Sequence, residues 1–198
     1  MSQSCAADVS AAILAGGEGV RVEGRDKGLM LLSGRPLIDW VCTSLRGQVG
    51  RILICANRNA SKYAAYGTVV PDAAPGFRGP LAGIASALTA CPTPWLVTVP
   101  VDNPHPPAVL CQRLHAAAVA AGVPAAVLHD GEHREPLFAI YRREAAVSAR
   151  EALDRDSPVW RWQDELGAVD VDFSDCVAEL VNLNTAGDFR RMEQQRRG

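Results

Sequence analysis

A glycine-rich segment with two basic residues follows the first apolar run of the chain. In order, it contains Gly16, Gly17, Gly19, Arg21 and Lys27. Glycine lets a phosphate approach backbone amides closely, and lysine and arginine supply the positive charge that a triphosphate needs. The spacing matches neither the P-loop pattern nor the glycine pattern of dinucleotide-binding folds. The glycines alone would also suit a tight turn, but the basic residues favour a phosphate site.

Polar residues stand at the expected ends of three later strands. Asn57, Asp72 and Asp102 each come at or directly after a short apolar run. Ligands bind beyond the carboxyl ends of the strands in open α/β sheets, so we expect these side chains along one edge with the glycine segment. Asp102 suits Mg²⁺, which prefers one or two carboxylates together with phosphate oxygens. Structural alternatives stay open, because Asn57 and Asp72 suit turns and Asp102 suits a helix cap.

The spacing of apolar residues predicts strands that alternate with helices. Strands are expected at 9–14, 51–56, 68–72, 95–102, 125–130, 136–141 and 168–173, the last as a half-exposed or edge strand. Helices are expected at 36–48, 80–90, 106–122, about 143–154, about 158–166 and 185–197. This order implies one α/β domain with a mainly parallel central sheet and helices on both faces.

A second polar segment precedes the last expected helix. Asn182 and Asn184 occupy alternate positions, so an extended backbone would place both side chains on one side. Thr185 is a suitable N-cap for the helix that follows. The two asparagines are therefore candidates for a binding site, and Thr185 is expected to cap the helix in either case.

Composition and charge disfavour several kinds of partner. The formal net charge is −2, so there is no overall positive field to attract nucleic acid. No apolar run reaches the ~18 residues of a membrane span, and we expect no signal peptide. The six cysteines form no C-x-x-C pair and are expected to be free and buried.

Taken together, the motifs resemble those of the nucleotidyltransferases, and specifically of the molybdenum cofactor guanylyltransferases. The segment LAGGEGVRVEGRDKG at 14–28 is similar to the signature L-A-G-G-x-G-x-R-M-G-x-x-D-K-G. Further matches follow in family order: ANR (56–58), PD (71–72), GPLAGI (79–84), VDNP (101–104), HDGEHREPLFAIY (129–141) and VNLNT (181–185). The resemblance covers nearly the whole chain.

The resemblance implies a three-layer Rossmann-like nucleotidyltransferase fold and a specific reaction. GMP would be transferred from GTP to the terminal phosphate of molybdopterin, giving molybdopterin guanine dinucleotide and pyrophosphate, with Mg²⁺ as cofactor. The implied nucleotide-binding residues are Leu14, Ala15, Gly16, Gly17, Lys27, Asn57, Asp72 and Asp102.

The same resemblance implies how these residues divide the work. Lys27 would bind phosphate with Arg21 beside it, and Asp102 would ligate Mg²⁺, so these three form the expected catalytic set. Asn182 and Asn184 would lie near molybdopterin. Arg134 is a further candidate for that substrate, chosen from its place in the HREP turn.

Related activities remain as alternatives. Cytidylyltransferases of the same cofactor typically carry L-A-A-G where this chain has LAGG at 14–17, and they lack the PLAG seen at 80–83. Sugar-phosphate and isoprenoid nucleotidyltransferases often have a metal-binding aspartate where Asn184 stands here. Both differences favour the guanylyltransferase. Outside the enzymes, the alternative is a nucleotide-binding protein without catalysis.

The chain departs from the family pattern beside the expected site. Val22 and Glu23 stand where Met-Gly is usual, and Val101 and Asn103 flank Asp102 in place of the commoner residues. These differences bear on fine geometry rather than on the expected metal role.

The resemblance also sets expectations for organisation and partners. One domain would span residues 1–198, with about 8–104 binding the nucleotide and about 105–198 on the second-substrate side. We expect a cytoplasmic monomer that acts on GTP and molybdopterin, with no nucleic-acid or membrane partner. Cofactor-insertion proteins or chaperones of molybdoenzymes are candidate partners.

Overall fold

The secondary structure is given by a computed structural model that describes residues 5–16, 26–72 and 78–195. Its strands are β1 (Val9–Leu14), β2 (Leu31–Leu32), β3 (Arg35–Pro36), β4 (Arg51–Cys55), β5 (Thr68–Val70), β6 (Trp95–Pro100), β7 (Ala125–His129), β8 (Arg134–Arg142) and β9 (Val169–Asp172). Its α-helices are α1 (Leu37–Leu45), α2 (Ala60–Tyr63), α3 (Pro80–Ala90), α4 (Leu110–Ala121), α5 (Ala146–Asp154), α6 (Val159–Glu165) and α7 (Ala186–Gln195). Short 3₁₀ helices are η1 (Cys5–Asp8), η3 (Lys27–Leu29), η4 (Arg143–Ala145) and η5 (Ser174–Glu179).

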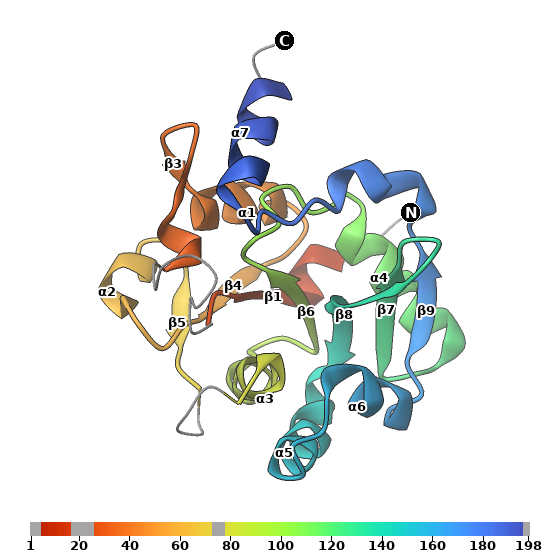
Figure 1. Ribbon diagram of the computed structural model, residues 1–198. Helices are drawn as coiled ribbons and strands as arrows, with labels where there is room; N and C mark the ends of the chain where they lie inside the picture. Colours follow the sequence, from red (N-terminus) through yellow and green to blue (C-terminus); the bar gives the residue numbers. More distant parts are fainter. Residues whose placement is uncertain (1–4, 17–25, 73–77, 196–198) are drawn as a thin grey trace.

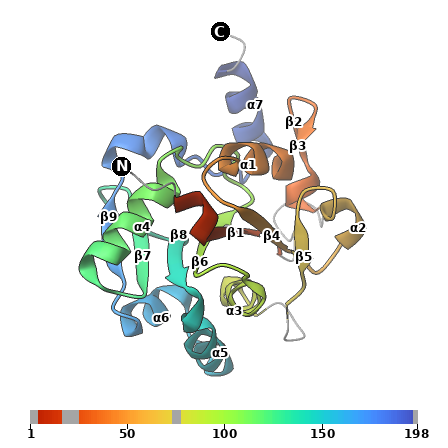
Figure 2. The ribbon, with the colours of Figure 1, turned by 180° about the vertical axis from the view of Figure 1, so that it is seen from behind.

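The described part of the chain forms one seven-stranded sheet in the order β5-β4-β1-β6-β8-β7-β9 (Figures 1 and 2). Strands β5, β4, β1 and β6 run parallel to one another. Strand β8 is antiparallel to both of its neighbours, and β9 pairs in parallel with β7 at the edge. The sheet is thus mostly parallel, as predicted, and β9 is the predicted edge strand.

Helices cover both faces of this sheet, because successive residues of the central strands point to opposite sides. Ala11 and Ile13 of β1 belong to the core beneath α1 and α4, whereas Ala12 belongs to the core beneath α3, α5 and α6. In both ribbon views, α3, α5 and α6 lie below the sheet and α1 lies above it. Full burial of an isoleucine such as Ile13 contributes roughly 1.5–3 kcal/mol. Apolar packing on both faces thus holds the strands, and with them the strand ends, in place.

Helix bounds agree with the sequence where proline and glycine mark them clearly. Helix α3 spans the predicted residues, and α4 ends at Gly122, which adopts the left-handed conformation with φ 66°. The beginning of α4 differs, since the helix starts at Leu110 and not at residue 106. Pro106 and Pro107 account for this, because the residue before a proline is pushed out of helical geometry.

A small third core joins three segments that the sequence analysis did not connect. The hairpin of β2 and β3 turns at Ser33 and Gly34, both with positive φ, as a two-residue hairpin turn requires. The buried residues of the third core are Leu32, Leu37, Trp40, Leu183 and Phe189. This cluster ties the hairpin and α1 to α7, which projects beside the hairpin (Figure 1). It therefore fixes the segment that carries Asn182 and Asn184.

Five cysteines are free and buried, as predicted, namely Cys42, Cys55, Cys91, Cys111 and Cys176, whereas the side chain of Cys5 lies outside what the structure describes. Burial raises the pKa of Cys42 to about 11 and that of Cys55 to about 12, so both thiols stay protonated near neutral pH. Among the described helices, none has the length and apolar character needed to cross a membrane.

Candidate nucleotide site

Three side chains from distant parts of the chain meet beyond the carboxyl end of β6. The ammonium of Lys27 donates to Asp102 Oδ2 at 2.8 Å and to Asn184 Oδ1 at 2.7 Å. Lys27 begins η3, Asp102 follows β6, and Asn184 precedes α7. The structure thus brings together one residue from each of three separate sequence motifs.

The backbone around Asp102 is tied to both β1 and the C-terminal segment. Val101 donates its N–H to Leu14 O at 3.2 Å, and Leu183 donates its N–H to Asp102 O at 2.9 Å. These bonds hold the turn after β6 next to the end of β1 and next to the asparagine pair. Asp102 therefore has a fixed backbone on both sides.

Asn103 stabilises the same turn from inside. It is fully buried, donates from Nδ2 to Glu179 O at 2.9 Å, and accepts from the His105 N–H at 3.1 Å. The alternative role for Asp102 as a helix cap is wrong, because α4 is preceded by Val109, with no side-chain capping bond. Asn103, unusual for the family at this place, is thus a structural residue of the turn.

The second carboxylate oxygen of Asp102 is buried and unpaired. Within the described residues, Oδ1 has no hydrogen-bond partner while Oδ2 binds Lys27. A buried carboxylate oxygen without a partner is costly and calls for an explanation. Mg²⁺ fits this oxygen, since it accepts one protein carboxylate and completes its shell with phosphate oxygens and water. No cluster of three His, Cys, Asp or Glu residues that could hold a metal occurs in the described parts of the chain.

Asn57 and Asp72 form a second polar pair, at the ends of β4 and β5. Asn57 Nδ2 donates to Asp72 Oδ2 at 2.7 Å, and Asn57 Oδ1 accepts from the Asp72 N–H at 2.8 Å. Helix α3 approaches closely here, since a Cβ on Gly83 would lie 3.6 Å from Asp72 Oδ1 and 3.3 Å from Cys55 Cβ. The pair is therefore rigid, although Asn57 is exposed.

The end of β1 lies between these two groups. Ala15 donates its N–H to Cys55 O at 3.0 Å, and a Cβ on Gly16 would lie 3.8 Å from Asn57 Nδ2. Leu14 accepts from Val101, as described above, so β1 contacts both polar groups. Gly17 and Arg21 lie outside the described residues, as do Val22 and Glu23.

The segment before α7 contributes to both the core and the site. Leu183 is buried in the third core, and Asn184 reaches Lys27. The placement of Asn182 and Asn184 on one side of the chain stays a prediction. Asn182 Oδ1 is buried and has no partner among the described residues. Thr185 Oγ1 accepts from the Asp188 N–H at 3.2 Å, so the predicted cap is confirmed.

Arg134 is placed differently from the other candidates. Its guanidinium binds the carboxylates of Asp164 and Asp170 at 2.6 Å each, and these ion pairs raise its pKa. The adjacent Glu135 is half-buried, and its pKa is raised by burial and by the nearby charges of Asp130 and Asp102. Sequence reasoning missed this second carboxyl group near Asp102, although it stands beside Arg134 in the same motif.

Comparisons with known proteins show the family to which the chain belongs. Residues 11–169 match the family model described as a MobA-like NTP transferase domain. A molybdenum cofactor guanylyltransferase from Vibrio cholerae is 39% identical over 182 residues, which cover 90% of this chain and 88% of the relative. One from Ralstonia nicotianae is 36% identical over 200 residues, covering 96% and 98%.

Solved structures show the same fold. The molybdopterin-guanine dinucleotide biosynthesis protein A of Archaeoglobus fulgidus superposes with a TM-score of 0.79 at 24% identity, over 95% of this chain and 98% of that one. The 2-C-methyl-D-erythritol 4-phosphate cytidylyltransferase of Thermus thermophilus gives 0.69 at 16% identity, over 94% and 98%. The chain therefore belongs to the MobA-like NTP transferase family, alongside the molybdenum cofactor guanylyltransferases, and is a nucleotidyltransferase of molybdenum cofactor biosynthesis.

Proposed function

We propose that the chain transfers GMP from Mg²⁺-bound GTP to the terminal phosphate of molybdopterin. The observation that carries this proposal is the meeting of Lys27, Asp102 and Asn184 beyond β6, where one buried oxygen of Asp102 has no partner in the part of the chain that the structure describes. A lysine and a carboxylate held together suit a phosphate chain and its cation. The relatives named guanylyltransferase support the choice of nucleotide.

The reaction needs positioning and charge neutralisation more than acid–base chemistry. A phosphate oxygen of molybdopterin forms a bond to the α-phosphorus of GTP, and the bond from that phosphorus to the β-phosphate bridge breaks, releasing pyrophosphate. The attacking group is already anionic, so no general base is required. Catalysis then comes from holding both substrates in line and from stabilising charge on the phosphate oxygens.

Lys27 is the described residue best placed for this work. Its ammonium has three donors, and its two partners Asp102 and Asn184 leave a further N–H for a phosphate oxygen. Arg21 is proposed to act beside it. When bound, Mg²⁺ would neutralise phosphate charge, and Asp102 Oδ1 would hold it.

The nucleoside is proposed to lie near the ends of β1, β4 and β5. The Asn57–Asp72 pair presents a fixed amide and carboxylate, which suit the hydrogen-bonding groups of a base or ribose. Backbone groups of Leu14, Ala15 and Gly16 lie beside this pair. Residues about 8–104 would thus form the nucleotide side of the domain.

Molybdopterin is proposed to lie on the side formed by residues 105–198. The candidates are Asn184, which accepts from Lys27, and Asn182, whose Oδ1 is buried with no partner among the described residues. Arg134 would have a supporting place only, because two aspartates already balance its charge.

A nucleotide panel tests the proposal. Purified chain is incubated with molybdopterin, Mg²⁺ and one of GTP, CTP, ATP or UTP, and dinucleotide product and pyrophosphate are measured together. We expect both products with GTP. Product with CTP alone would identify the cytidylyltransferase instead. Binding of GTP without pyrophosphate release, even when molybdopterin is present, would identify a non-catalytic nucleotide-binding protein.

A further inference from the structure

The residue before Lys27 is held by one short helix. Asp26 accepts a hydrogen bond on Oδ1 from the Tyr63 hydroxyl and one on Oδ2 from Asn59 Nδ2 at 2.9 Å. Asn59 precedes α2 in the left-handed conformation, with φ 54°, and Tyr63 is the last residue of α2. Both oxygens of the Asp26 carboxylate are thus fixed by the two ends of the same helical turn.

The residue after Lys27 packs against the same tyrosine. Gly28 is buried, and a Cβ there would overlap the Tyr63 hydroxyl and come within 3.1 Å of Val101 Cγ2. Glycine is therefore required for close packing at this position. Tyr63 contacts the chain on both sides of Lys27, and Val101 directly precedes Asp102.

The backbone between these anchors forms one closed turn. Leu29 donates its N–H to Asp26 O, and Met30 donates to Lys27 O, both at 3.1 Å. The main chain of Lys27 consequently has little freedom, and its side chain extends to Asp102 and Asn184.

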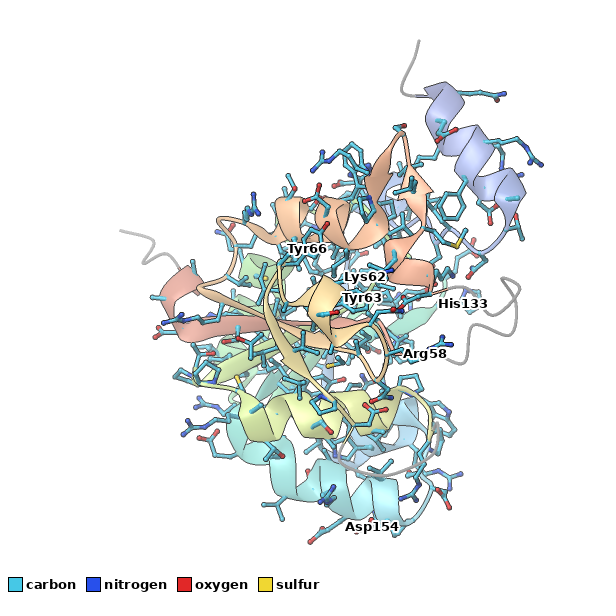
Figure 3. The ribbon with its side chains drawn as sticks, turned by 90° about the vertical axis from the view of Figure 1, so that its left-hand side faces the viewer. Arg58, Lys62, Tyr63, Tyr66, His133 and Asp154 are labelled. Atoms are coloured by element: carbon cyan, nitrogen blue, oxygen red, sulfur yellow. The ribbon has the colours of Figure 1, made fainter. Side chains whose placement is uncertain are left out.

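Burial protects the hydrogen bond between the Tyr63 hydroxyl and Asp26. Its side chain is fully buried in the core beneath α1 and α4, and Figure 3 shows it at α2, on the side of the molecule that faces the viewer. Burial and the bond to Asp26 raise the pKa of the phenol well above its ordinary value. The hydroxyl therefore stays protonated near neutral pH and donates its hydrogen to Asp26.

We infer that Tyr63, with Asn59, is a positioning residue for the transfer reaction. It holds Asp26 and Gly28 so that Lys27 meets the phosphate chain, and it does not touch the substrate itself. This inference rests on the proposed function, because it gives Lys27 its phosphate. The sequence motif ends at Gly28, so nothing in it points to a partner on α2.

The test compares Tyr63→Phe with a matched control, Tyr66→Phe. Tyr66 is the next tyrosine along the chain, also labelled in Figure 3, and lies outside the site. Without the Tyr63 hydroxyl, Asp26 loses one of its two side-chain bonds and Lys27 is held less exactly, so we expect kcat of Tyr63→Phe to fall by about ten- to a hundredfold. We expect Tyr66→Phe to keep wild-type kcat.

A second background separates positioning from general damage. In a Lys27→Ala protein, adding Tyr63→Phe should lower kcat by less than about twofold, because residues that act through one another are not additive. An equal loss in both backgrounds would overturn the inference. Should Tyr63→Phe fold poorly, Asn59→Gly removes the other bond to Asp26 while keeping the left-handed backbone, and we expect it to reduce kcat by about threefold. Wild-type kcat in that variant would overturn the inference equally.

An activity-independent measurement distinguishes this inference from the proposed function. Amide hydrogen exchange at Leu29 and Met30 should accelerate by about tenfold in Tyr63→Phe and stay unchanged in Tyr66→Phe. If wild-type protein transfers no nucleotide, the proposed function fails, and the exchange rates still decide whether Tyr63 holds the turn. Unchanged exchange in Tyr63→Phe would overturn the inference.

Discussion

Asp72 and Asp102 stand at matching places in the fold and have opposite surroundings. Each lies two residues beyond a parallel strand, Asp72 after β5 and Asp102 after β6. The backbone N–H of Asp72 donates to Asn57, and Asp72 Oδ2 accepts from Asn57, so the two residues satisfy each other's hydrogen-bonding groups. Asp102 binds the Lys27 ammonium through Oδ2, and its buried Oδ1 has no partner in the described ranges of the chain. Topology brings both carboxylates to one edge, but their local partners separate their roles.

A third carboxylate, that of Asp188, has hydrogen-bond partners on both oxygens. Asp188 accepts from the N–H groups of Thr185 and Asn184 and also binds Arg191, and the Thr185 bonds lower its pKa from 3.8 to about 2. Both of its oxygens are occupied, and it completes the cap that Thr185 forms at the start of α7. Asp102 differs from Asp188 because its Oδ1 has no hydrogen-bond partner among the described residues.

The largest expected effect comes from Asp102→Ala. Removing the carboxylate that pairs with Lys27 and is proposed to hold Mg²⁺ should lower kcat by about 10²–10³-fold, the usual size for one charge-stabilising group. The measurement is pyrophosphate release with GTP and molybdopterin at saturating Mg²⁺. Wild-type kcat in this variant would remove Asp102 from the catalytic set.

Lys27→Ala should come next, with a loss of about 10²-fold in kcat. The alanine removes the donor that is proposed to bind the phosphates, and it leaves Asp102 and Asn184 without the partner they share in the structure. The same assay is run beside Lys62→Ala, a control that removes an exposed lysine at α2. Equal rates for Lys27→Ala and the control would contradict the role of Lys27.

Asp72→Ala should affect binding more than chemistry. Loss of the proposed nucleoside contact would remove binding that ground and transition states share, so we expect KM for GTP to rise about tenfold with kcat within about twofold. Steady-state kinetics with varied GTP separates the two constants. A fall in kcat as large as that of Asp102→Ala would show that the two carboxylates are not distinct.

The smallest expected effect is on stability and concerns Asp188 at the start of α7. Because the pKa of Asp188 is lowered in the fold, its stabilising contribution is complete above about pH 4 and is lost as pH falls toward 2. Asp188→Asn should therefore be less stable than wild type near neutral pH, with a difference that shrinks between pH 4 and pH 2. Denaturant unfolding at stepped pH measures this difference, and a constant gap down to pH 2 would contradict the assignment.

The sequence predicted those parts of the fold that depend on local signals. Strand β1, helix α3 and the glycine end of α4 follow directly from apolar runs, proline and glycine. The hairpin at 31–36 and the four-residue α2 were missed, since segments this short carry no measurable periodicity. The antiparallel placement of β8 depends on long-range pairing, which local patterns do not specify.

The candidate site was predictable to the same extent. The motifs named Lys27, Asp102 and Asn184 separately, and the sheet topology explains why they meet. The partners that orient them were not predictable, because Tyr63 is 37 residues away from Asp26 and has no motif of its own. Arg134 shows the converse, as a residue chosen from its turn whose charge is already balanced by two aspartates.

One structure determination tests the central claim most directly, namely a complex with Mg²⁺ and the non-hydrolysable analogue α,β-methylene-GTP. The account predicts the cation against Asp102 Oδ1, the Lys27 ammonium within hydrogen-bonding distance of a phosphate oxygen, and the guanosine beside Asn57 and Asp72. A nucleotide bound elsewhere, or a cation that makes no contact with Asp102, would contradict it.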